Sequence, residues 1–358
     1  MSGRAPTFGH RVEYLLFRAT AAATGVLGDR IVGSLTGAAG KLAYRPFGLR
    51  RAVVEAHLRA SFPERDERWV RETAAAAYAH LGREGATLIR LSTLARERVV
   101  ERTEVEGLDT FLEAVEAGKG VVLVTGHFGN WEIGGAALAA RGVPIDGVAQ
   151  RQSNPLFDRA LVAARERLGM RVIERGRAPK LGLRALRAGR VLAFVADQDA
   201  RRAGVFVPFF GRPASTHRGP ALLALRTGAP LFLGTALRMP DGRYRIRLEE
   251  VEVDRTGETD VDVQRLTAAF TARLEAAIRT APEQYFWHHR RWKTPPPEEP
   301  VVGASGINPE SDAARDGRQR AMERPEHLDI HLHSDVQRGA HDRSHAVEDP
   351  PGDGGVPA

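Results

Sequence analysis

The hydrophobic and polar positions divide the middle of the chain into short apolar runs and longer amphipathic stretches. The run VVLVT at 121–125 is uninterrupted and mostly β-branched, which is typical of a strand covered on both faces. Further strands are predicted at 143–149, 171–174, 191–196 and 230–236, and an antiparallel or edge strand at 243–253. Helices are predicted over 131–141, 156–169, 179–188, 218–228 and 259–280. This alternation predicts an α/β fold, with a mostly parallel sheet flanked by helices.

The same pattern divides the chain into residues 1–50, a folded domain at 51–293, and a tail at 294–358. Residues 52–118 are rich in Ala, Leu, Glu and Arg, and are predicted to be helical. Residues 14–44 are apolar, but Asp29 and Arg30 interrupt them, and a membrane span needs about 20 apolar residues in a row. Two interpretations stay open for this segment: a pair of core helices, or helices that anchor the protein in or on a membrane.

Composition narrows the possible functions. The chain of 358 residues has no cysteine, which excludes disulfides, thiolate metal sites and a cysteine nucleophile. Its net charge is +7, but residues 294–358 carry −7 and residues 1–293 carry +14. The tail has few aliphatic residues and is predicted to be disordered. Its five histidines raise the possibility of metal binding, but its composition favours a solvated tail. A basic folded part suggests anionic partners.

The stretch VTGHFGNWEIGG at 124–135 carries the candidate chemistry. His127 lies two residues past a predicted strand, where open α/β sheets form their sites. Gly129 permits a tight turn, and Glu132 falls in the first turn of the next helix. A core histidine is the alternative. Because GxSxG, Walker and HExxH motifs are absent, the pattern favours a histidine general base held by a carboxylate, without an enzyme nucleophile.

Four motifs in order resemble the lipid A biosynthesis acyltransferase family, the late lauroyl and myristoyl transferases of the wider H-x4-D/E acyltransferase group. They are GHFGNWE, QRQSNPLFD at 150–158, ADQDARRAGVFVPFFGRPASTHRGPALLAL at 196–225, and EQYFWHHRRWK at 283–293. The resemblance, over about residues 10–295, implies a membrane-associated enzyme that passes an acyl chain from acyl carrier protein, or coenzyme A, to a lipid hydroxyl. His127 is then the general base and Glu132 its orienting partner. No cofactor or metal is implied.

Further residues are candidates for substrate binding. Arg151, at a position of the second motif, or backbone N–H groups near Gly129 and Asn130, would hold the oxyanion. Asp199 lies in DQD, and the resemblance places DQD where the wider group has a phosphate-binding Pro-Glu-Gly motif. Two roles stay open for Asp199: it orients an arginine or an acceptor hydroxyl, or it only caps a turn. The arginines that would bind phosphate are Arg201, Arg202, Arg212 and Arg218.

The apolar stretch GVFVPFFG at 204–211 has two interpretations, a core strand or the wall of an acyl channel. The channel residues would be Val205, Val207, Phe209 and Phe210. WHHRRWK at 287–293 suits a membrane interface or an acidic carrier protein. We expect an enzyme on the cytoplasmic face of the inner membrane, at an anionic surface, with a lipid A precursor as acceptor. The alternatives are another acceptor (phosphatidylinositol mannoside, an aminolipid or a lysophospholipid) and a non-catalytic nucleic-acid-binding protein; we expect no nucleic acid as partner.

Overall fold

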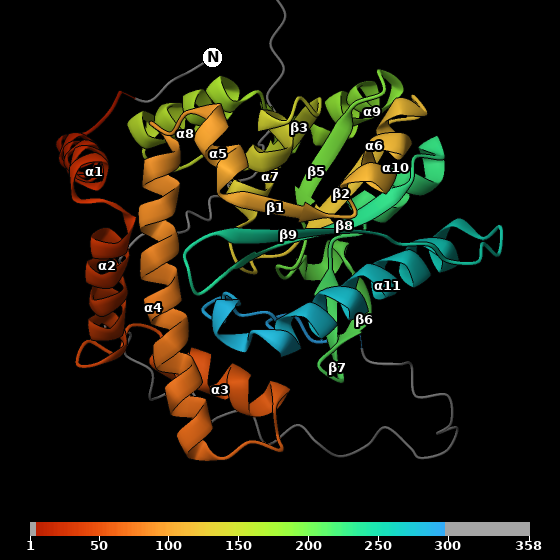
Figure 1. The fold of residues 1–358 in the computed structure, drawn as a ribbon. Helices are drawn as coiled ribbons and strands as arrows, with labels where there is room; N and C mark the ends of the chain where they lie inside the picture. The colour runs from red at the N-terminus through yellow and green to blue at the C-terminus, as the bar shows by residue number, and fades with distance from the viewer. Residues whose placement is uncertain (1–4, 298–358) are drawn as a thin grey trace, which may run out of the picture. The chain divides into compact units, whose positions relative to one another are not determined.

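A seven-stranded sheet forms the centre of residues 5–297, the part that the structure, a computed structural model, describes (Figure 1). Its strands are β1 (Thr103–Glu106), β2 (Val121–Thr125), β3 (Ile145–Ala149), β4 (Arg171–Glu174), β5 (Val191–Val195), β8 (Leu231–Arg238) and β9 (Tyr244–Glu250). The order across the sheet is β1-β9-β8-β2-β5-β3-β4. Only the β8–β9 pair is antiparallel. The predicted α/β fold, mostly parallel with an antiparallel strand at 243–253, is confirmed.

The helices predicted beside the sheet begin and end within one residue of their expected bounds. They are α7 (Trp131–Ala140), α8 (Pro155–Leu168), α9 (Ala178–Arg187), α10 (Gly219–Thr227) and α11 (Thr259–Thr280). α6 (Leu108–Glu116) also lies beside the sheet, within the stretch predicted to be helical, and the described residues further form the 3-10 turns η1 (Arg175–Arg177), η2 (Arg201–Ala203) and η3 (Pro282–Gln284). Pro155, Pro179 and Pro220 stand in the first turns of their helices, where a missing N–H costs nothing.

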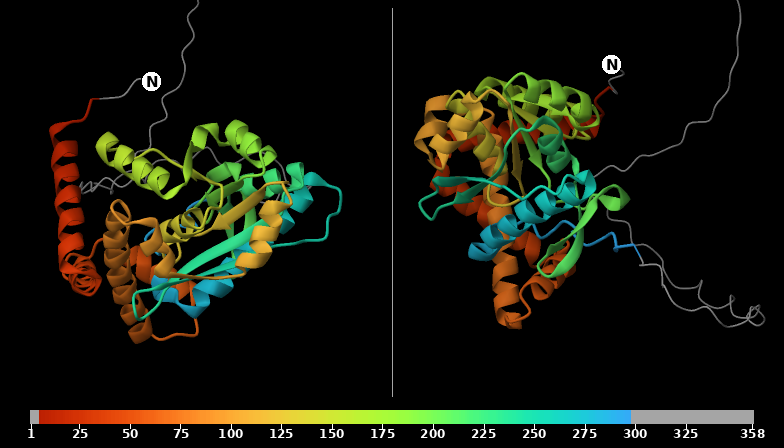
Figure 2. Two further views of the ribbon diagram at one scale, coloured as in Figure 1. Left: turned by 45° about the horizontal axis from the view of Figure 1, so that its top comes forward. Right: turned by 90° about the vertical axis from the view of Figure 1, so that its right-hand side faces the viewer.

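The sheet buries both of its faces, and each face has its own core. Along β2, Val122 and Val124 point to one side, while Val121 and Leu123 point to the other, because successive strand residues alternate. The first pair joins a cluster with residues of α9, α10 and α11, and the second pair joins residues of α6 and α7. Helices therefore cover both faces, and the carboxyl ends of β2, β3 and β5 are left to form a site (Figures 1 and 2).

In the described part of the chain, five helices precede the first strand of the sheet: α1 (Phe8–Leu27), α2 (Asp29–Tyr44), α3 (Arg51–Ser61), α4 (Glu67–Leu91) and α5 (Arg96–Glu101). α2 packs closely on α4 through glycines. A Cβ at Gly40 would lie 2.1 Å from the carbonyl oxygen of Tyr78, and one at Gly82 would lie 2.1 Å from that of Thr36. Within residues 5–297, no helix combines the length and apolar character that a membrane crossing requires.

Two strand features were not predicted as they occur. β1 lies inside the stretch predicted to be helical, since its sequence TEVE contains no apolar run. The apolar stretch at 204–211 forms β6 (Val205–Phe209), which pairs with β7 (Arg212–Thr216) in a separate antiparallel hairpin. The tail expected at 294–358 lies, from residue 298 onward, outside the described residues.

Candidate active site

The loop that carries His127 is held tightly between β2 and α7. Gly129 has a φ of +59°, and a Cβ there would lie 1.9 Å from the carbonyl oxygen of Ala236 on β8, so only glycine fits. Asn130 caps α7, because its side-chain oxygen accepts a hydrogen bond from Ile133 N at 2.9 Å. Gly129 and Asn130 are therefore explained by the backbone they shape, and the loop presents His127 at the carboxyl edge of the sheet.

The carboxylate that contacts His127 belongs to Asp197, which follows β5, the neighbour of β2. Nδ1 of His127 lies 2.7 Å from Oδ1 of Asp197, and the backbone N of His127 donates to Oδ2 at 2.8 Å. Burial disfavours ionisation of Asp197, but the charge and hydrogen bonds of His127 outweigh it and lower the carboxyl pKa to about 2. An ionised carboxylate only accepts hydrogen bonds, so Nδ1 carries the ring proton and the lone pair lies on Nε2.

The open side of the imidazole is bordered by aromatic rings and an amide. The Trp131 ring lies 4.5 Å from the His127 ring, and the Phe286 ring lies 6.0 Å away, measured between centroids. Nε2 of Gln198 lies 3.4 Å from Nε2 of His127. The His127 side chain is 19 % exposed and that of Asp197 is 3 % exposed. The pair is thus anchored on its buried side and accessible at Nε2, the geometry of an oriented general base.

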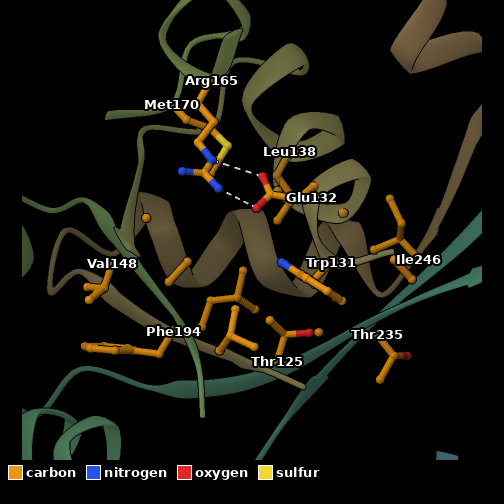
Figure 3. A pocket seen from close by; sticks show the side chains of 18 of the residues that line it. Thr125, Trp131, Glu132, Leu138, Val148, Arg165, Met170, Phe194, Thr235 and Ile246 are labelled. Carbon is orange, nitrogen blue, oxygen red and sulfur yellow. Dashed lines mark hydrogen bonds and ion pairs between the residues drawn. The ribbon is translucent and has the colours of Figure 1, made fainter. Parts of the chain in front are cut away.

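Glu132 does not contact His127, contrary to our expectation. Its carboxylate makes a two-pronged ion pair with Arg165 of α8, with Nε–Oε2 at 3.0 Å and Nη2–Oε1 at 2.5 Å (Figure 3). The helix direction explains the difference, since position 132 in the first turn of α7 faces α8. Burial lowers the pKa of Arg165, but the charge of Glu132 outweighs it and raises that pKa overall. Asp197 takes the orienting position that the sequence suggested for Glu132.

An apolar cavity lies between α7 and the sheet, immediately beside the histidine (Figure 3). The empty space between its lining residues is about 670 Å³, a figure that includes the solvent at its mouth. Thr125 and Trp131 line it next to His127, and Leu138, Val148 and Phe194 line it further along. The Glu132–Arg165 pair also contributes to the lining.

Small residues create the room for this cavity. The lining includes Gly134 and Gly135 of α7, Gly147 of β3, Ala193 of β5 and Gly234 of β8. A glycine inside a helix costs about 1 kcal/mol relative to alanine, so two in succession need a reason. A Cβ at Gly135 would lie 3.1 Å from Cε of Met170. The paired glycines of WEIGG are the signal of this cavity in the sequence, and the cavity was not predicted from them.

The residues predicted to form an acyl channel lie elsewhere. Val207, Phe209 and Phe210 are buried, and none of them, nor Val205, lines the cavity. Phe209 and Phe210 pack against aromatic rings of Phe62, Tyr285, Trp287 and Trp292. The alternative interpretation, a core strand, describes this stretch.

The remaining predicted residues do not converge on the histidine. Arg151 is exposed and pairs with Glu174 at 3.1 Å, and Arg218 pairs with Asp260 at 2.5 Å. Arg201 and Arg202 lie on the exposed turn η2, and Arg212 stacks on Trp292. The backbone N of Asp199 donates to Nε2 of His289 at 2.9 Å, and its carboxylate accepts from Thr294 at 2.9 Å. These contacts join Asp199 to the C-terminal motif, and its Oδ1 is buried without a hydrogen-bond partner among residues 5–297, so both interpretations of Asp199 stay open.

The C-terminal motif folds back against the catalytic loop. Phe286 N donates to the carbonyl of His127 at 2.9 Å, and Tyr285 hydrogen-bonds Asp197; burial and then that charge raise the pKa of Tyr285 well above 10. Trp287, His288 and Arg291 are buried, so they are not available to a membrane interface, which corrects that interpretation. Burial lowers the pKa values of His288 and His289 to about 4.

A buried polar network supports the loop from the opposite side. Glu84 of α4 accepts hydrogen bonds from Nδ2 of Asn130 at 2.6 Å and from the Tyr244 hydroxyl at 2.7 Å, and it pairs with Arg238 at 3.2 Å. Nε2 of His80 lies 3.3 Å from the carbonyl oxygen of Gly129. α4, β8 and β9 are therefore tied to the residues beside His127.

An oriented base beside an apolar cavity is compatible with acyl transfer to a hydroxyl, and sequence comparison places the protein among the acyltransferases. The chain belongs to the bacterial lipid A biosynthesis acyltransferase family, whose sequence profile matches residues 1–294. It is therefore an enzyme of that family, as the resemblance implied.

Two types of relative are similar to this chain. A phosphatidylinositol mannoside acyltransferase of Mycolicibacterium smegmatis is 33% identical over 61% of this chain and 70% of its own length. The lipid A biosynthesis lauroyltransferase of Escherichia coli is 32% identical over 72% of this chain and 83% of its own. The lipid A biosynthesis palmitoleoyltransferase of the same organism is 29% identical over 74% and 84%. The family implies an acyl donor and a lipid acceptor, whereas the acceptor's identity differs among these relatives.

Proposed function

We propose that the protein transfers an acyl chain from a thioester to a lipid hydroxyl, with His127 as general base. Nε2 removes the hydroxyl proton as the oxygen attacks the thioester carbonyl. The new C–O bond forms, the C–S bond breaks, and the proton on Nε2 passes to the departing sulfur. Asp197 holds the ring in the productive tautomer and stabilises the imidazolium. The observation that carries this proposal is the buried 2.7 Å contact between His127 and Asp197.

We further propose that the donor's acyl chain occupies the cavity beside Trp131. Its lining is predominantly apolar, as an acyl chain requires, and it includes Thr125 and Trp131, which lie on either side of His127 in the chain. Trp131 borders both the cavity and the imidazole, so a chain seated there brings its carbonyl to Nε2. The donor is an acyl carrier protein or coenzyme A thioester, in keeping with the family.

The proposed acceptor is a lipid A precursor. The lauroyltransferase supports this acceptor through its coverage of 72% of this chain. A phosphatidylinositol mannoside is the second candidate, because the mannoside acyltransferase is as similar in identity. In the experiment, the purified enzyme is incubated with each acceptor in turn and with lauroyl, myristoyl and palmitoyl donors, and the products are identified by mass spectrometry. Acylation of the mannoside alone would overturn the lipid A assignment, and acylation of neither would overturn the proposed function.

We also propose that α1 and α2 seat the enzyme on the cytoplasmic face of the inner membrane. Large apolar side chains are more than half exposed there: Phe8, Leu15, Leu16, Val26, Ile31, Leu35 and Leu42. Exposed cations accompany them: Arg11, Arg18, Arg30, Lys41 and Arg45. Such a surface suits the interface of an anionic bilayer, and the glycine contacts with α4 keep α2 fixed to the enzyme.

Membrane washing tests this location. Wild-type protein should remain on membranes in high salt, because apolar insertion is not screened. The variant Leu15→Asp/Leu16→Asp should be released, whereas Val261→Asp, an exposed apolar residue on α11, should behave as wild type. Wild-type protein in the soluble fraction at ordinary salt would contradict the assignment.

A further inference from the structure

A row of cations runs along α9 without acidic partners. Residues 175–190 contain six basic residues and no acidic residue. Arg177, Lys180, Arg184 and Arg187 are exposed and recur at spacings of three and four, so they share one face of the helix. The opposite face is buried through Ala178, Gly182, Ala185 and Leu186.

In the described part of the chain, the cations of α9 lack the ion pairs that several cations on other helices make. Within residues 5–297, none of the four on α9 forms an ion pair, whereas Arg59 pairs with Glu67, Arg68 with Glu72, and Arg279 with Glu275. Arg190, just after α9, pairs with Asp146 at 2.6 Å. Like charges three or four residues apart destabilise a helix slightly, so this arrangement does not serve the stability of α9.

The row begins at the catalytic edge of the sheet. Arg175, just before α9, donates to the side-chain oxygen of Gln150 after β3 at 3.2 Å. Burial and then the charge of Arg175 lower the pKa of His217 to about 4, and the charge of Asp197 acts on the same imidazole in the opposite direction, so His217 lies near both Arg175 and Asp197. From there α9 runs back along the sheet toward the start of β5 (Figure 1).

The position and composition of this face select the kind of partner. α1 and α2, with the exposed apolar side chains, lie at the left of Figure 1 beyond α4, whereas α9 lies at its upper right, so the cations of α9 form a surface apart from the apolar one (Figures 1 and 2). Residues 175–190 include no aromatic side chain on which nucleic-acid bases would stack. A folded acidic protein fits a rigid row of unpaired cations.

We propose that the exposed face of α9 docks an acidic carrier protein, which delivers the acyl thioester to His127 on a flexible arm. This inference rests on the proposed function. Arg177, Lys180, Arg184 and Arg187 steer and orient the carrier, and Arg175 stands where the arm enters the site. Because the contacts are charged and exposed, they act chiefly on the rate of association and its salt dependence.

The test compares two donors with the same acyl chain, one on acyl carrier protein and one on pantetheine, which is uncharged and cannot use α9. In Arg184→Glu/Arg187→Glu, kcat/KM for the carrier donor should fall on the order of tenfold at low salt, with kcat and the pantetheine reaction unchanged. The control is Arg65→Glu/Arg68→Glu at the start of α4, which reverses the same charge on another face. Its carrier reaction should match wild type.

A binding measurement with the carrier protein distinguishes a failure of the docking surface from a failure of the proposed function. Carrier protein without an acyl chain should bind the wild-type enzyme, in a salt-sensitive way, and bind the α9 variant at least about tenfold more weakly. Equal losses with both donors, or no loss in carrier binding, would overturn the docking surface. The docking surface would also be overturned if the α9 variant lost affinity for RNA or anionic vesicles and kept its affinity for the carrier protein. A wild-type enzyme that binds the carrier but transfers from neither donor would refute the proposed function while leaving the docking surface supported.

Discussion

Replacing Asp197 by asparagine isolates the orienting role of its carboxylate. The change keeps the size of the side chain and removes its charge. An asparagine oxygen can retain the backbone hydrogen bond of His127, now 2.8 Å. The amide N–H would then face Nδ1, now 2.7 Å from the carboxylate, and donate to it. The ring proton would move to Nε2, the atom that must accept the proton from the hydroxyl.

The magnitude follows from that tautomer change. We expect kcat to fall on the order of 10³-fold to 10⁴-fold, the scale seen when a histidine base is held in the wrong tautomer. The free energy of unfolding should fall by only about 1 kcal/mol, because one hydrogen bond is exchanged for another. Initial rates of product formation by mass spectrometry, with the melting temperature measured alongside, give both quantities.

One outcome would refute this reasoning. If Asp197→Asn kept kcat within threefold of wild type, the carboxylate would not orient the base. A large loss of both activity and melting temperature would instead mean that Asp197 acts through folding. Asp146→Asn is the matched control, because Asp146 is also buried and paired, with Arg190. It should change the melting temperature more than kcat.

Three further predictions concern the ion pair, the cavity and the buried histidines. Glu132→Gln leaves Arg165 charged and buried without its partner carboxylate, so the melting temperature should fall by roughly 5–10 °C. The double variant Glu132→Leu/Arg165→Leu should recover part of that loss, and a double variant in which the losses of the two single variants add would contradict the pairing. Ala193→Leu should shorten the preferred acyl chain by about three carbons across a series of donors, by occupying the cavity with three more carbon atoms; an unchanged preference would exclude the chain from it. Burial lowers the pKa values of His217, His288 and His289 to about 4, so between pH 6.5 and 4 the unfolded chain binds protons that the native protein does not. The stability present above pH 6.5 should therefore be lost as the pH falls through this range, and a melting temperature that does not change with pH would contradict this.

The fold was predictable because its elements carry strong local signals. VVLVT, VLAFV and the long amphipathic stretch of α11 gave the strands and helices nearly to the residue. β1 was missed since a short polar edge strand has no period of its own. Gly129 and His127 were recognised from the turn that they form.

The partner of His127 was not predictable in the same way. Glu132 is near in sequence, but the direction of a side chain on α7 depends on how that helix packs on α8. Asp197 is 70 residues away and meets His127 only because β5 pairs with β2 in register. The presence of the cavity likewise depends on the distance between α7 and the sheet, which the sequence does not specify. Gly134 and Gly135 indicate only that other residues approach α7 closely.

The central claim is tested most directly by the rate of acyl transfer in His127→Ala. The measurement is the first-order rate constant for transfer of a labelled acyl chain from its thioester to the lipid acceptor, with the enzyme in saturating excess over the thioester. The variant and the wild type must have the same melting temperature. The account predicts a loss of at least about 10²-fold relative to wild type, with thioester binding retained. Transfer at near the wild-type rate by a folded His127→Ala protein would contradict it.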